Sequence, residues 1–297
     1  MPRHDNARGI AMMLLAVLLL ACMDAGLKQL SLHYPAMQVT ALRALASWPF
    51  VAAWVLWKTR GRGLTRVRWP LQILRAALFV GTLTIFVYGV RRLPLTTTYT
   101  LFFIAPLLIT ALSALLLRDK VGAHRWAVIG IGFAGVLLAL RPTGEGAFTL
   151  AGLAIIAAAC GYSASAITAR VLGRTDSTES MLFWTMTLMA PVATALAWRH
   201  WVAIAGADWP VIAAVGVVGA AGQYALTDAF ARAEPSVVAP LEYTALAWGV
   251  TFDLTIWKVL PDAMTWLGAA IIVAAGVYLM RRERKDRLAN MEAQVQP

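Results

Sequence analysis

Charged side chains are scarce in this sequence. Only 14% of its 297 residues are charged and 60% are hydrophobic, whereas soluble domains have about 25% charged residues. So few charges cannot cover the surface of a soluble domain, and their shortage excludes a sizeable soluble domain in this chain. Apolar runs of about 20 residues recur along the chain instead, each long enough to cross a hydrocarbon core of about 30 Å. We therefore predict an all-α integral membrane protein.

Motifs for nucleotides, cofactors and metals are also missing. No G-x-x-x-x-G-K-[ST] sequence occurs, so ATP is not expected to drive this protein directly. Gly130-x-Gly132-x-x-Gly135 has the letters of the dinucleotide fingerprint but lies in an apolar run with no strand before it, where small residues favour helix packing. The four histidines lack metal-ligand spacing, and Cys22 and Cys160 fall inside predicted helices as buried free thiols. We predict no cofactor and no metal.

Ten apolar spans follow one another, with mostly short links that make consecutive helices antiparallel neighbours. The first span lacks an A-x-A cleavage site and is too long for a signal-peptide core, so we expect it to be retained. Pro49, Pro106, Pro191 and Pro240 lie inside spans and should kink their helices. The expected spans are residues 9–31, 36–57, 71–91, 94–117, 123–140, 150–171, 178–198, 209–232, 236–257 and 263–281.

A repeat of half the chain length organises these spans. Each copy opens on a basic residue and a proline, runs through apolar residues to a short polar turn, and resumes at Trp126 or Trp266. Each carries Ala-Gly-Val near its end and closes on arginine, at an offset of 140 or 141 residues. This self-similarity indicates a duplication. The predicted parts are a first repeat, 1–142, a second repeat, 143–282, and a cytoplasmic tail, 283–297.

Five spans in each repeat is an odd number, which places the second repeat upside down in the membrane relative to the first. Inverted repeats are typical of secondary transporters, in which two related halves move about a site near the bilayer midplane. We therefore predict two inverted five-helix repeats. Duplication for stability alone is the competing interpretation.

Lysine and arginine are distributed unequally between the two sides of the membrane. The loops on the side of the N-terminus hold 19 of these residues, Arg75 among them, and the opposite loops hold five. Lys28 and Arg43 fall inside spans. The positive-inside rule then places both termini in the cytoplasm of a multi-pass protein of a bacterial-type inner (plasma) membrane. The net charge of +11 is explained by this topology and by attraction to the anionic lipid bilayer, not by nucleic-acid binding.

Three segments carry a family resemblance: GLKQL (26–30) in the first span, ALRA (41–44) in the second, and APLLITALSALLLRDKVGAHRWAVIGIGFAGVLLAL (105–140) across the fourth and fifth. Their order resembles the EamA-type carriers of the drug/metabolite transporter superfamily, and most of all the YddG-type amino-acid exporters. The resemblance implies a basket of helices around a central cavity between two inverted halves. Asp119 stands where members often have glutamate.

Charges inside the first two spans are expensive in a bilayer and therefore suggest function. Asp24 and Lys28 are four residues apart and share a helix face. Arg43 lies at a depth similar to that of Asp24, about 10 Å from the outer side at 1.5 Å per residue. These depths leave an Asp24–Arg43 bridge geometrically open, with Lys28 able to extend outward. The bridge is interpreted either as a structural ion pair or as an outer gate that binds the substrate's charged end, with Tyr88 near the outer end of the third span.

The second repeat carries its own charges near the opposite side. Asp228 lies close to the inner end of the eighth span, and Glu242 lies about two turns into the ninth. Glu242 has only Arg232 as a plausible cation, so we expect it to be protonated part of the time and to exchange protons. Proton coupling or gating competes here with a purely structural role. Polar and aromatic neighbours in sequence are Gln223, Tyr224 and Tyr243.

Aromatic side chains could line a substrate pocket. Tyr99 and Phe103 share a face of the fourth span, and Tyr162 and Trp248 fall near mid-membrane, where a phenol hydroxyl facing lipid would lack a partner. The resemblance implies that Tyr162 and Tyr243 match cavity-lining aromatic positions of the amino-acid exporters.

These features predict a secondary transporter that exports amino acids, aromatic or hydrophobic ones or related zwitterionic metabolites, by alternating access. Its partners would be the small-molecule substrate and the bilayer. Uptake of a metabolite such as S-adenosylmethionine is the alternative within transport. A membrane-embedded enzyme is the alternative of another class, disfavoured because no Ser/His/Asp set and no sizeable soluble loop are present.

Overall fold

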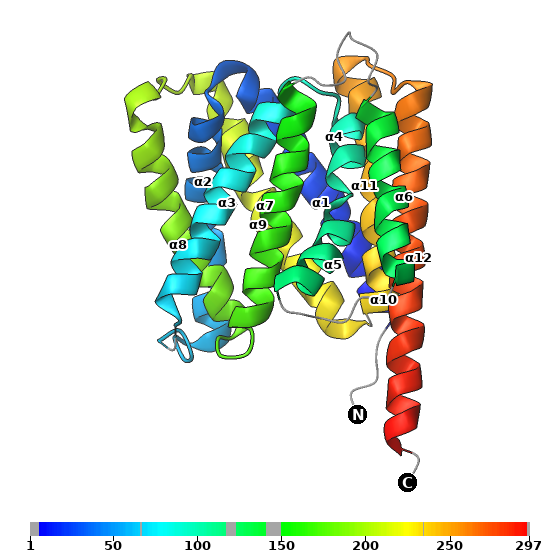
Figure 1. The fold of residues 1–297 in the computed structure, drawn as a ribbon. Coiled ribbons are helices and arrows are strands. Elements are labelled where there is room, and N and C mark those ends of the chain that lie inside the picture. Colours follow the sequence, from blue (N-terminus) through cyan, green and yellow to red (C-terminus); the bar gives the residue numbers. More distant parts are fainter. Residues whose placement is uncertain (1–5, 66, 117–122, 141–149, 234, 296–297) are drawn as a thin grey trace.

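The computed structural model describes residues 6–65, 67–116, 123–140, 150–233 and 235–295, and within these ranges the only regular elements are helices. The helices run up and down in one bundle (Figure 1). The prediction of an all-α membrane protein is confirmed at this level. Figure 1 also shows that α1 begins and α12 ends at the same end of the bundle. We call this the inner end, and the opposite end the outer end.

Most of the expected spans end within a few residues of the helices observed. Eight helical stretches of the described chain are long and apolar enough to cross a membrane, and α6 is a shorter apolar helix. The unbroken helices are α1 (Asn6–His33), α2 (Ala36–Thr59), α3 (Trp69–Val90), α6 (Ala123–Leu140), α7 (Leu150–Leu172), α8 (Thr178–Ala197), α9 (Trp209–Arg232) and α12 (Ala263–Val295).

Two expected spans are broken. The fourth consists of α4 (Leu95–Phe102) and α5 (Ala105–Leu116). Pro106 accounts for this break, because its ring nitrogen cannot donate to the carbonyl of Phe102 and its ring crowds that carbonyl. The span expected over 236–257, with a kink at Pro240, is interrupted more extensively than predicted. That stretch is divided into α10 (Pro235–Val238), the 3₁₀ helix η3 (Ala239–Thr244), α11 (Ala245–Phe252) and the π-helical turn η4 (Asp253–Trp257).

Small residues bring the helices close together. α1 packs mainly on α9, α3 on α7, α2 on α8, and α6 on α12. A Cβ added to Gly216 of α9 would lie 2.5 Å from the Ala46 carbonyl of α2, and one added to Gly135 of α6 would lie 2.9 Å from Ile271 of α12. The glycine motif in α6 is therefore a packing surface, although Gly130 faces open space.

Both cysteines are free, as expected, but only Cys22 is partly buried, and Cys160 is exposed on α7. In the described part of the chain, no group of three or more His, Cys, Asp or Glu residues could hold a metal ion.

Candidate functional site

Asp253 lies at the outer end of the bundle and was not among the residues predicted from the sequence. It is fully buried at the start of η4. Its carboxylate accepts hydrogen bonds from the backbone N–H groups of Leu95 and Thr96, at 2.9 and 2.8 Å, and from the Thr96 hydroxyl at 2.8 Å. The first N–H groups of a helix lack partners within it and carry partial positive charge. Asp253 thus caps α4 from another helix.

Lys28 completes this contact. Its Nζ lies 3.8 Å from Asp253 Oδ1 and donates to the Leu93 carbonyl at 2.7 Å. It also lies 4.4 Å from the centre of the Trp257 ring. Lys28 does not extend outward to solvent, because Asp253 offers it a carboxylate inside the bundle and only 7% of the residue is exposed.

The Asp24–Arg43 bridge that the matching depths left open is absent, since no oxygen of Asp24 lies within 4 Å of an Arg43 nitrogen in the described coordinates. Asp24 instead accepts a hydrogen bond from the Tyr99 hydroxyl at 3.1 Å, and Arg43 stays within electrostatic range. Such a bridge requires that α1 packs on α2, but α1 packs mainly on α9. We call Asp24, Lys28 and Asp253 the outer charge group. Tyr88 lies apart from it, with the Arg92 guanidinium 3.9 Å above its ring.

Glu242 lies in the inner half, on η3, without an ion pair. Arg232, the one cation that the sequence offered to Glu242, donates to Asp228 one turn earlier on α9. Among the described side chains, no cation lies within 4 Å of the Glu242 carboxylate. The phenols of Tyr162 on α7 and of the adjacent Tyr243 are within electrostatic range of Glu242.

Arg75 was assigned to the wrong place by the prediction from the sequence. It was counted with a loop because it is close to the start of the third span, but it lies inside α3, partly buried. Its Nε and Nη1 are buried without a hydrogen-bond partner in the part of the chain described. Its guanidinium lies 5.6 Å from the Phe79 ring and within electrostatic range of Tyr162. We call Arg75 and Glu242 the inner charge group.

Aromatic rings connect the two charge groups. Tyr99, which binds Asp24, stacks on Phe103 at 6.3 Å, and Phe103 meets Tyr243 at 4.9 Å. Tyr162 packs on Phe102 at 5.4 Å. The structure therefore joins three of the predicted aromatic residues by ring contacts and pairs the fourth, Tyr162, with Phe102, the sequence neighbour of Phe103. We call these five residues the aromatic set. The Tyr243 hydroxyl is buried without a partner among the described residues.

The other predicted binding residues lie elsewhere. Trp248 stacks on Phe252 at 6.4 Å and packs against a separate apolar cluster. Gln223 and Tyr224 line a groove between α2, α8 and α9, where Tyr224 meets Trp54 at 5.6 Å. The structure does not bring these three into the aromatic set.

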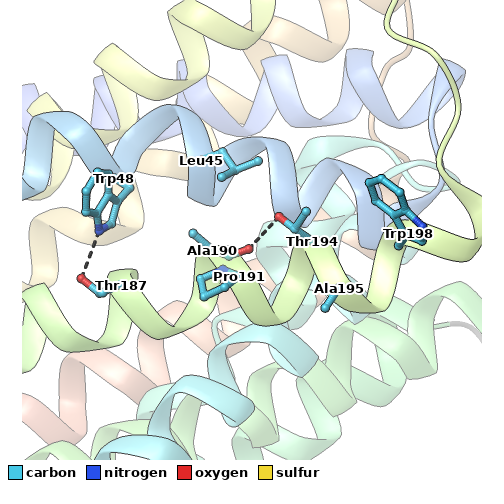
Figure 2. Close-up of a pocket in the computed structure, with 8 residues that line it drawn as sticks. All are labelled: Leu45, Trp48, Thr187, Ala190, Pro191, Thr194, Ala195 and Trp198. Carbon is cyan, nitrogen blue, oxygen red and sulfur yellow. Dashed lines mark hydrogen bonds between the residues drawn. The ribbon is translucent and has the colours of Figure 1, made fainter.

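An apolar groove lies between α2 and α8 (Figure 2). Its volume is about 720 Å³. Trp48 Nε1 donates to Thr187 Oγ1 at 3.0 Å across it, and no charged side chain lines it. A lining without charge does not suit a zwitterion, so this groove is not the candidate site.

A chain whose described elements are all helices, with charges kept inside apolar helices, has the features of a multi-pass membrane transporter. Comparison with known families agrees. The model of the EamA-like transporter family matches residues 7–141 and again residues 149–282, and the chain belongs to this family.

Curated relatives cover nearly the whole chain. It is 24% identical to a pseudopaline exporter of Pseudomonas aeruginosa over 93% of this chain and 97% of the relative. It is 27% identical to a riboflavin transporter of Vibrio cholerae (95% and 96%) and 26% identical to an S-adenosylmethionine uptake transporter of Rickettsia felis (96% and 97%). A crystal structure with a TM-score of 0.63, at 20% identity, covers 93% of this chain and 98% of the other, and shares the fold. The resemblance to the family is confirmed, but these relatives do not single out the YddG-type exporters.

Proposed function

We propose that this protein is a secondary carrier that exports amino acids or related zwitterionic metabolites by alternating access. It would cross the inner membrane ten times, in two inverted halves formed by residues 1–142 and 143–282, with both termini in the cytoplasm. The observation that carries the substrate class is the aromatic set with charges of both signs around it. A zwitterion with an apolar side chain needs such surroundings.

The two matches of the family model support the inverted halves, because they fall on the two proposed repeats. Helix packing supports them as well. If α1–α6 and α7–α12 correspond, the α1–α9 contact and the α7–α3 contact are the same contact made twice. The α2–α8 and α6–α12 contacts then each join two equivalent helices.

Two basic residues, one in each proposed half, make contacts that correspond to each other. Lys28 of α1 contacts Asp253 near the end of the broken ninth segment, at the outer end. Arg170 of α7, about one repeat length later, donates to Ser113 near the end of α5, at the inner end. Each contact links the first helix of one half to the last part of the broken segment of the other. Such pairs could close the two ends of the bundle in alternation.

Broken helices support transport as the mechanism. Interrupted backbone is tolerated at membrane depth where it lies inside the protein or lines a water-filled passage, and transporters use it at their binding sites. Here the interruptions in the fourth and ninth segments carry Phe103, Glu242 and Tyr243. Movement of these segments would expose the aromatic set to one end and then to the other.

Counterflow in proteoliposomes with a panel of labelled amino acids tests the proposal. We expect accumulation of at least one aromatic or large apolar amino acid. Accumulation of no amino acid would overturn it. S-adenosylmethionine and riboflavin belong in the same panel, because relatives are named for their transport. Exclusive accumulation of S-adenosylmethionine would favour the second candidate, a carrier for that class of metabolite.

A further inference from the structure

We propose that Arg75 binds the carboxylate of the transported solute, with the Tyr162 hydroxyl beside it. This inference rests on the proposed function, because it assigns one end of the zwitterion to one side chain. Other basic residues deep in the described helices have a partner or an opposite charge in range. Lys28 contacts Asp253, Arg232 contacts Asp228, and Arg43 has Asp24 within electrostatic range. Arg170 donates to Ser113.

The surroundings of Arg75 do not compensate its charge. An unpaired cation inside a membrane helix is costly and usually marks a substrate or ion pathway. The Phe79 ring, 5.6 Å away, offers a cation–π contact that offsets only part of this cost. Two of the guanidinium nitrogens remain buried without an acceptor in the described structure. A ligand with acceptor oxygens would satisfy them.

The same face of α3 carries a second unsatisfied group. Arg75, Phe79 and Thr82 follow one another at helical spacing, so their side chains lie on one face. The Thr82 hydroxyl is buried and also lacks a partner among the described residues. Gly161 of α7 packs directly against Thr82, which places the adjacent Tyr162 beside this face. Two unpartnered polar groups next to the aromatic set are what a bound polar end would complete.

A carboxylate fits the guanidinium best among the groups of a zwitterion. The arginine fork presents parallel N–H donors that match two carboxylate oxygens, and charge-assisted bonds of this kind are stronger than neutral ones. Glu242 places a second, acidic group within electrostatic range of the same tyrosine. Its negative charge would face the ammonium end of the solute and would repel a second carboxylate.

Thermal melting of the purified full-length protein tests the assignment without transport. The probes are 3-phenylpropionate, its amide and inorganic phosphate, and the proteins are wild type, Arg75→Gln, Arg75→Lys and Arg174→Gln. Arg174 is an exposed arginine just beyond the inner end of α7, so its substitution controls for net charge. We expect only the carboxylate to stabilise wild type and Arg174→Gln, with affinity at least about tenfold weaker in Arg75→Gln.

The outcomes separate this inference from the proposed function. Equal affinity of Arg75→Gln and wild type for 3-phenylpropionate overturns the assignment. It is also overturned if the amide or phosphate stabilises wild type as much as 3-phenylpropionate does, or if none of the three probes stabilises wild type. Should Arg75→Gln fail to fold, unchanged affinity in Arg75→Lys overturns it instead, because lysine lacks the fork. A wild type that accumulates no amino acid, yet binds the carboxylate through Arg75, refutes only the proposed function.

Discussion

The outer and inner charge groups contain similar residues but treat them differently. In the outer group, Asp253 accepts three hydrogen bonds and an ion pair, and Asp24 accepts a bond from Tyr99. In the inner group, neither Arg75 nor Glu242 has an ion-pair partner among the described residues. Satisfied charges hold helices together, whereas unsatisfied ones remain available to a solute or a proton. On the function proposed above, the outer contacts would serve closure and the inner charges recognition.

Asp253→Ala should have the largest effect on this comparison. It removes the cap of α4 and leaves Lys28 buried without its carboxylate, and breaking a buried pair in this way costs about 3–5 kcal/mol. We expect a large fall in melting temperature in detergent or failure to fold. The double variant Lys28→Met/Asp253→Asn should recover part of the loss, because no charge is then left unpaired. An Asp253→Ala protein that melts like wild type would show that the outer contact is not structural.

Ser113→Asp should make the inner end resemble the outer one. Arg170 already donates to Ser113, and a carboxylate at this position would replace a neutral contact by an ion pair. A preference of about 1 kcal/mol for one closed state changes the ratio of the two closed states about fivefold. We expect a several-fold lower initial rate of counterflow with an unchanged or higher melting temperature. Ser113→Asn is the control, and an unchanged rate in Ser113→Asp would argue against a closing role for this contact.

Asp24→Asn tests whether the outer group also takes part in transport. Asp24 keeps its hydrogen-bonding shape as asparagine, so loss of the charge is the main change. If Asp24 gates or binds, transport per folded molecule should fall about tenfold while the melting temperature changes by no more than about 2–4 °C, the shift expected for about 1 kcal/mol. Tyr99→Phe is the matched control, because it removes the same hydrogen bond and keeps the charge. A fall in stability with normal transport would make Asp24 structural.

The sequence was sufficient to predict where most helices begin and end, but not which helices pack against each other. Apolar runs bounded by polar residues place α6 and α9 correctly to the residue. Pro106 and Pro240 signalled the breaks in the fourth and ninth segments, but the 3₁₀ and π turns of the ninth depend on its packing and could not be read from composition.

The misplaced charges have one physical cause. Depth along a helix follows from counting residues, whereas the direction of a side chain and the identity of the neighbouring helix follow from tertiary packing. Asp24 and Arg43 are at matching depths, but α1 packs mainly on α9. Arg75 lies near a helix end and was taken for a loop cation. Asp253 could have been found, because it is an acidic residue inside an apolar run at the repeat position of Ser113.

Glu242→Gln should have the smallest effect on the rate of transport. It should instead change how that rate depends on pH. The groups within electrostatic range of Glu242 are the phenols of Tyr162 and Tyr243, and neither neutralises a carboxylate. Glutamine imitates the protonated acid, so the variant should transport at all pH values as wild type does at its low-pH limit. We expect wild-type transport to change as pH falls and Glu242 takes up a proton, and the variant to give a flat profile with unaltered folding.

Asp228→Asn is the control, because Asp228 is paired with Arg232. A Glu242→Gln protein that keeps the wild-type pH response would remove Glu242 from proton exchange and leave it a structural residue of η3.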